Sequence, residues 1–151
     1  MNSSEGVSPP LLFIAGASGY IGGRLLSRLE QDGARVRCLA RHPESLESRV
    51  GPNTSIVRGD VLDRSWLESA LVEVDVAYYL VHSMASSGDF VERDRLAARN
   101  FALAARATGV DRIVYLGRRG RSGRSRGRGR GGRRVAGHRL CRFDAVRRRD
   151  Q

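Results

Sequence analysis

The sequence contains no lysine, so each of its 27 basic residues is an arginine. This absence excludes any catalytic pair that needs a lysine, and it indicates a gene of very high G+C content. Cysteine is scarce as well. The two cysteines, Cys38 and Cys141, have neither a metal-binding nor a redox spacing. We therefore expect Cys38 to be a small core residue in a reducing cytoplasm.

Long apolar runs are also absent. No run reaches the ~20 residues that a membrane span requires, so we expect no membrane partner. Met1–Pro9 is polar and lacks a basic region followed by an apolar core, which argues against a signal peptide. We interpret residues 1–10 as a disordered leader, and the length of 151 residues as that of at most one domain.

The net charge of +11 is concentrated at one end of the chain. Residues 1–116 hold 13 arginines and 14 acidic residues, whereas residues 117–151 hold 14 arginines and two aspartates. Most of this second segment is Arg, Gly and Ser without apolar periodicity, so it cannot bury enough surface to offset the entropy of ordering. We predict that residues 118–151 form a disordered basic tail.

This tail has three interpretations. It could bind RNA or DNA through their phosphates, although Phe143 is its one aromatic residue on which a base could stack. It could be an inert extension. It could also be translated from a shifted frame, because shifted codons of G+C-rich DNA encode mainly Arg, Gly, Ala and Pro. The abrupt loss of pattern after Gly117 favours the third interpretation, and nucleic acid is a partner only if the tail is genuine.

Strands and helices are expected to alternate between residues 11 and 117, because apolar runs of strand length are separated by segments of helical periodicity. This pattern is typical of an α/β domain with a doubly wound parallel sheet of five strands in the order 3-2-1-4-5. A further strand and a substrate region are missing, so we expect the fifth strand to be an uncovered edge of an aggregation-prone domain. The expected strands are Leu11–Ala15, Arg35–Ala40, Ser55–Arg58, Val76–Val81 and Arg112–Leu116, and the main helices are Tyr20–Gln31, Arg64–Val72 and Phe90–Thr108.

Three glycines spaced three apart, Gly16, Gly19 and Gly22, follow the first strand and open the first helix. Gly16 allows a sharp turn, Gly19 allows the backbone to approach phosphates, and Gly22 allows the helix to pack on the strand. The N-terminus of that helix directs backbone N–H groups and a partial positive charge at the ligand. This order of elements predicts a site for a dinucleotide pyrophosphate.

The end of the second strand indicates which dinucleotide binds. Folds of this kind that bind NAD usually carry an acidic residue there, which holds the ribose 2′-OH. This chain has Arg41, with Arg37 earlier in the strand, and a guanidinium suits a 2′-phosphate, so NADP is favoured over NAD. NAD stays the alternative if Arg41 is only a solvated residue. Asp60, after the third strand, could accept a hydrogen bond from the adenine amine or cap the following turn.

The motifs together resemble an atypical short-chain dehydrogenase/reductase, and more narrowly the NmrA-like, NAD(P)H-binding group. They are G-A-S-G-Y-I-G-G-R-L, C-L-A-R-H-P, R-G-D-V-L-D, A-Y-Y-L-V-H-S-M and D-R-L-A-A-R-N-F-A-L-A-A-R-A-T-G-V-D-R-I-V-Y-L-G. The resemblance covers about residues 11–117 and implies a Rossmann fold with an NAD(P) cofactor. It also implies cofactor-binding roles for Gly16, Ser18, Gly19, Tyr20, Ile21, Gly22, Arg41, Asp60, Val61, Leu80, Val81, His82 and Ser83.

The catalytic residues of that resemblance are missing. The general mechanism uses a Tyr with a Lys four residues later, and the chain has no lysine and no tyrosine in the right region. A weak catalytic candidate is His82, which more often packs against the cofactor or loop backbone. Asn100 lies mid-helix, where related folds direct an Asn at the active site, although a packing role is equally expected.

Two functions follow from these observations. The first is an NADP-binding reductase or redox sensor that lacks its substrate region and acts on an unknown small molecule. The second is a non-catalytic nucleic-acid-binding protein that acts through the Arg-Gly tail. Whether the chain is an enzyme stays open at this point.

Overall fold

The computed structural model describes residues 8–81, 88–118, 134–135 and 138–144. Strands and helices alternate from the first described residues to β5, as the periodicity predicted, and no bound differs from its prediction by more than two residues. Within the described ranges no helix is long and apolar enough to cross a membrane. The elements are β1 Leu11–Ala15, α1 Tyr20–Gln31, β2 Arg35–Ala40, α2 Glu44–Glu47, β3 Thr54–Arg58, α3 Arg64–Ala70, β4 Val76–Tyr79, α4 Gly88–Ala107, β5 Arg112–Arg118, β6 Arg134–Val135 and β7 His138–Asp144.

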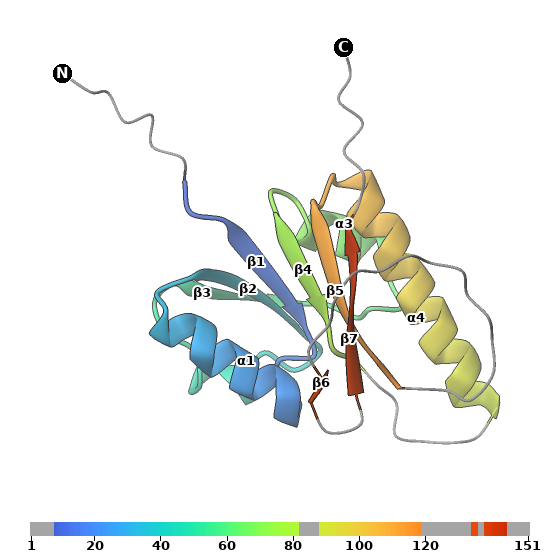
Figure 1. Cartoon of the computed structure of the whole chain (residues 1–151), viewed down its shortest axis with the longest axis horizontal. Coiled ribbons are helices and arrows are strands. Elements are labelled where there is room, and N and C mark those ends of the chain that lie inside the picture. The colour runs from blue at the N-terminus through green and yellow to red at the C-terminus, as the bar shows by residue number, and fades with distance from the viewer. Residues whose placement is uncertain (1–7, 82–87, 119–133, 136–137, 145–151) are drawn as a thin grey trace, which may run out of the picture.

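The strands form one sheet in the order β3-β2-β1-β4-β5-β7-β6 (Figure 1). The first five are parallel, which confirms the predicted order 3-2-1-4-5. Asp75 ties the start of β4 to both of its neighbours. Its carboxylate accepts the N–H of Leu11 at 2.7 Å, and its carbonyl accepts the N–H groups of Asp111 and Arg112 at 3.0 and 3.2 Å.

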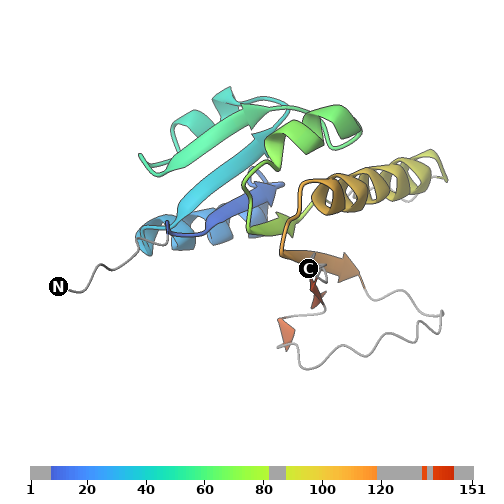
Figure 2. The ribbon, with the colours of Figure 1, turned by 90° about the horizontal axis from the view of Figure 1, so that it is seen from above.

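Helices cover both faces of the parallel sheet, with α3 and α4 on one side and α1 on the other (Figure 2). Successive residues of a strand point to opposite faces, so each strand contributes to two cores. Phe13 lies in the core beneath α3 and α4, whereas its neighbour Ile14 lies in the core beneath α1 and α2. Both side chains are fully buried, which is why the strands are continuous apolar runs.

The β5 edge is covered, contrary to our expectation. β7 pairs antiparallel with β5 along its whole length, from Arg112 opposite Asp144 to Arg118 opposite His138. From Arg112 to Tyr115, β5 therefore has a neighbouring strand on both sides. The segment predicted to be disordered, residues 118–151, contains Arg118 of β5 and the strands β6 and β7. Its other residues lie outside the described part of the chain. The divisions at residues 10 and 117, and the shifted-frame hypothesis, stay predictions.

Phe101 of α4 is the aromatic centre of the core beneath α3 and α4. It is 2% exposed, and its ring centroid lies 6.1 Å from Phe13 and 4.9 Å from Tyr79. Replacement Phe101→Ala should lower the free energy of unfolding by about 3–5 kcal/mol, because it removes these contacts and leaves a cavity. Leu96→Ala, on an exposed position of the same helix, should change it by less than about 0.5 kcal/mol. Urea denaturation followed by circular dichroism measures both, and equal losses would contradict this packing.

Cys38 of β2 is fully buried beneath α1, and desolvation together with the nearby Glu30 raises the pKa of its thiol to about 12. Because the thiolate is the reactive form, Cys38 should not react with Ellman's reagent in the native protein at neutral pH. The Cys141→Ser variant isolates the Cys38 signal. One thiol should become titratable only when denaturant unfolds the chain, and rapid reaction without denaturant would show that β2 is not a core strand.

Candidate cofactor-binding site

The turn after β1 and the first turn of α1 each contain a glycine at which there is no room for a side chain. Gly16 has φ +98°, and a Cβ there would lie 2.9 Å from the Leu80 carbonyl at the end of β4. A Cβ at Gly22 would overlap the Gly16 carbonyl. Gly16 therefore allows β1 to turn beside β4, and Gly22 allows α1 to start directly against that turn.

The N-terminus of α1 lies at the C-terminal edge of the parallel strands. Gly19 is its N-cap and makes no side-chain capping bond, and its first turn contains no acidic residue. The first N–H groups of a helix have no intrahelical partner, and the helix dipole adds partial positive charge at that end. This arrangement fits a phosphate group, because no carboxylate of α1 competes for these donors.

A pocket of about 420 Å³ opens at this edge of the sheet. Its wall includes the glycine turn, the ends of β2, β3 and β4, and the first half of α4, so five elements far apart in the sequence meet there. Eight of the predicted cofactor residues line it: Gly16, Ser18, Gly19, Arg41, Asp60, Val61, Leu80 and Val81.

Three of the described residues that were predicted to bind the cofactor do not form part of this wall. Gly22 is buried beneath the turn, and the exposed Tyr20 side chain accepts a hydrogen bond from Arg24 at 2.9 Å instead of facing the pocket. Ile21 is also exposed, which leaves backbone N–H groups as the contribution of this first turn. His82 and Ser83 lie outside the described residues, as does most of the Arg-Gly segment on which the nucleic-acid interpretation depends.

The residue after β2, Arg41, presents its guanidinium to the pocket, and the next carboxylate along the chain pairs with other residues. Arg41 lines the wall and forms no ion pair with any described residue. Glu44, the next acidic residue, lies 3.4 Å from His42 and 3.8 Å from Arg58, and its own backbone N–H, Arg58 and His42 lower its pKa. Arg37 does not support Arg41, because it donates to the carbonyls of Ala70 and Val72 at the end of α3.

The loop after β3 presents Asp60 to the pocket. One carboxylate oxygen of Asp60 accepts the N–H of Leu62 at 3.0 Å, so the side chain closes a turn within its own loop. Capping of α3 belongs to Asp63, which accepts the N–H of Trp66 at 3.2 Å. The side chain of Asn100 in α4 donates to the Leu62 carbonyl at 2.7 Å, so it contacts the loop and not the cavity.

One wall of the pocket, which α4 provides, was not predicted from the sequence. Phe90, Arg93, Asp94 and Ala97 line the pocket. Their spacing of three, four and seven residues places them on one face of a helix, which is the signal that could have identified them. The neighbouring Arg95 does not line the pocket and forms an ion pair with Glu92 at 2.9 Å.

No catalytic acid is evident among the described residues. Tyr79 is buried between Phe101 and Tyr115, and desolvation, with smaller effects of Asp94 and Tyr115, raises its pKa well above the ordinary value. It therefore stays protonated and packs as a core residue. In the described parts of the chain no group of His, Cys, Asp and Glu could hold a metal ion. The free N–H groups at the start of α1 and the guanidinium of Arg41 suit a phosphorylated ligand.

The chain is similar in sequence to an enzyme of known activity. The chain is 28% identical over 107 residues to 4-hydroxy-2-methyl-3-oxo-4-farnesyl-3,4-dihydroquinoline-1-oxide ketoreductase of Stigmatella aurantiaca. The match covers 69% of this chain but only 32% of that enzyme, so the chain spans about a third of the length of this relative.

Two solved structures show the same architecture. A Rossmann-fold NAD(P)-binding family protein from Shigella flexneri matches with a TM-score of 0.60 and 22% sequence identity. The match covers 70% of this chain and 50% of the Shigella chain, and it shows the fold. A mutant uronate dehydrogenase from Agrobacterium tumefaciens, complexed with NAD, matches with a TM-score of 0.61 and 25% sequence identity. This match covers 72% of this chain and 40% of the dehydrogenase chain. The model of a family described as NAD(P)H-binding matches residues 16–140. The chain therefore belongs to the NAD(P)H-binding family that its motifs resemble.

Proposed function

We propose that this chain is the cofactor-binding part of an NADP-dependent reductase or redox sensor. The observation that carries the proposal is the glycine turn at the N-terminus of α1, which opens onto a pocket lined by Arg41 and by Asp60. In this arrangement the α1 N–H groups bind the pyrophosphate, Arg41 meets the adenosine ribose, and the loop at Asp60 and Val61 meets the adenine. Leu80 and Val81 then border the path toward the nicotinamide. When bound, the nicotinamide supplies hydride-transfer chemistry.

The preference for NADP rests on charge at the end of β2. The 2′-phosphate of NADP adds negative charge at the point where NAD carries a hydroxyl group. Arg41 has no ion pair among the described residues and can form a forked hydrogen bond with that phosphate, whereas Glu44 is held by His42 and Arg58. An NAD-binding site usually has a carboxylate at this position, which holds the ribose 2′-OH.

Reductase and sensor are distinguished by residues beyond this pocket. The relative from Stigmatella aurantiaca is a ketoreductase, which supports reductase activity for a protein of this kind. We assign the described pocket residues to cofactor contacts and none of them to proton transfer. Catalysis therefore depends on a substrate-side group, and a cofactor sensor needs only the contacts described here.

Charge reversal at Arg41 tests the cofactor preference. Arg41→Glu should weaken NADPH binding by about tenfold to a hundredfold, the range expected for a charge-assisted hydrogen bond, and should shift the preference toward NADH. Isothermal titration calorimetry with each dinucleotide measures both constants.

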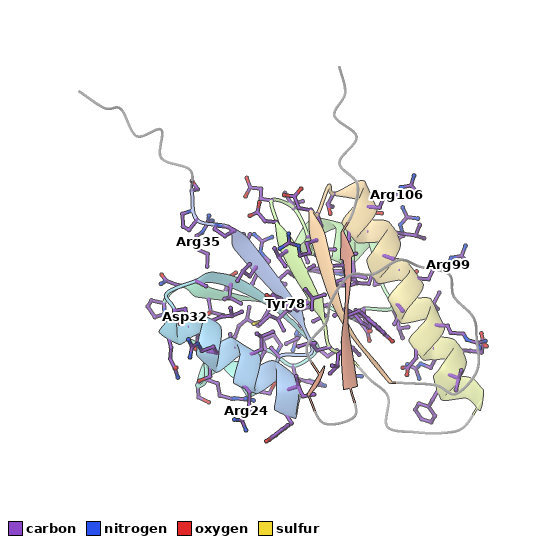
Figure 3. The ribbon with its side chains drawn as sticks, in the orientation of Figure 1. Arg24, Asp32, Arg35, Tyr78, Arg99 and Arg106 are labelled. Atoms are coloured by element: carbon purple, nitrogen blue, oxygen red, sulfur yellow. The ribbon has the colours of Figure 1, made fainter. Side chains whose placement is uncertain are left out.

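The control for Arg41→Glu is Arg106→Glu, which changes the net charge equally at the far end of α4 (Figure 3). This variant should retain the wild-type ratio of the two dissociation constants. A tighter affinity of the wild-type protein for NADH, or an unchanged ratio in Arg41→Glu, would contradict the assignment of NADP.

Gly22→Ala tests whether the α1 turn forms the phosphate site. The added methyl group overlaps the Gly16 carbonyl, so the turn must shift and the first N–H groups of α1 move with it. We expect dinucleotide affinity to fall more than about tenfold. Gly51→Ala is the matched control, since its Cβ would lie at an ordinary 3.6 Å from Glu30. If both variants retain wild-type affinity in the calorimeter, the pyrophosphate lies elsewhere.

A further inference from the structure

We propose that Asn100 is a positioning residue that makes the pocket select adenine over other purines, because it fixes the loop that aims the Asp60 carboxylate. The inference rests on the proposed function, since it concerns the base of the same dinucleotide. Asn100 itself does not line the pocket but lies behind the loop at Leu62.

Two hydrogen bonds meet at Leu62 and connect α4 to Asp60. The Asn100 amide donates to the Leu62 carbonyl at 2.7 Å, across 38 residues of sequence. The Leu62 N–H in turn donates to the Asp60 carboxylate at 3.0 Å. Asn100 therefore acts on Asp60 through one intervening residue, and Asp60 and Leu62 both line the pocket.

At its start the loop is held to the end of β2, because the Gly59 N–H donates to the Ala40 carbonyl at 3.1 Å. From Asp60 to Leu62, the other described hydrogen bonds apart from that of Asn100 lie within the loop itself. The N–H of Leu62 bonds to the Asp60 side chain, and the N–H of Asp63 bonds to the Asp60 carbonyl at 3.0 Å. Both bonds move with the loop if it rotates as a unit. The bond from Asn100 comes from a long helix whose buried face includes Ala97 and Phe101, so it supplies an external reference for the orientation of Asp60.

The chemistry of the Asp60 carboxylate identifies the base. An ionised carboxylate only accepts hydrogen bonds. One oxygen of Asp60 is occupied by Leu62, and the other has no hydrogen-bond partner within the described residues. The exocyclic amine of adenine is a donor and satisfies that oxygen. Hypoxanthine presents a carbonyl oxygen at the same position, which leaves the carboxylate unpaired and adds repulsion. The pocket should therefore favour the adenine dinucleotide by at least about tenfold.

The experiment compares NADPH with its hypoxanthine analogue, and NADH with its own hypoxanthine analogue. The fluorescence of Trp66 reports binding, because it is the single tryptophan of the chain and lies beside Gly59 of the pocket wall. The measured quantity is the ratio of the two dissociation constants within each pair. A general loss of structure weakens both ligands of a pair alike and leaves this ratio unchanged.

The variants are Asn100→Asp and Asn100→Ala. Asn100→Asp keeps the shape of the side chain but replaces the amide donor with an acceptor, so the chain can be tested even if the alanine variant does not fold. We expect the ratio to fall from at least about tenfold to about threefold or less in either variant. Arg99→Ala, on the exposed neighbouring position of α4, should keep the wild-type ratio.

The outcomes separate this inference from the proposed function. If the wild-type protein binds neither dinucleotide of a pair, the proposed function fails and the inference fails with it. If it binds both with equal affinity, or if the Asn100 variants keep the wild-type ratio, the cofactor site stands and the role of Asn100 is overturned.

Discussion

The pocket depends on a steric constraint, namely that the turn from β1 to α1 has no room for a Cβ at Gly16 or Gly22. Gly16 contacts the Leu80 carbonyl, so the turn packs directly against the end of β4. Gly22 allows the first turn of α1 to pack against the Gly16 carbonyl. A side chain at either position would separate the helix from the sheet. The N–H groups of α1 would then no longer converge on the edge where the strands end, and the site would lose its anion-binding wall.

The electrostatics of the pocket come from the other elements that meet there. Arg41 and Arg93 contribute positive charge, Asp60 and Asp94 contribute negative charge, and the α1 N-terminus adds a partial positive charge. This mixture of charges suits a ligand that has both phosphate groups and a base with an amine. The phosphates can bind to the cations and N–H donors, and the amine can donate a hydrogen bond to a carboxylate. Phe90 and Ala97 add apolar surface along the same wall.

Most of the parallel fold could be predicted because its information is local. Apolar runs such as Leu11–Ala15 predict strands buried on both faces, and the right-handed crossover rule then determines the strand order. β7 could not be found in this way. It joins the sheet through backbone hydrogen bonds to β5, and any extended segment can make such bonds whatever its side chains. An Arg-rich composition therefore concealed a strand whose pairing carries no periodic apolar signal.

The sequence by itself determined the glycine spacing, the guanidinium at Arg41 and the alternation of strands and helices, because each depends on residues close together along the chain. Only the tertiary structure decided that Arg37 bonds to the end of α3, that Asp94 faces the pocket, and that Asn100 contacts the loop at Leu62. These outcomes depend on how α3 and α4 pack against the sheet. A polar side chain on a helix can meet solvent, a pocket or another loop, and the rotation of the packed helix decides between them.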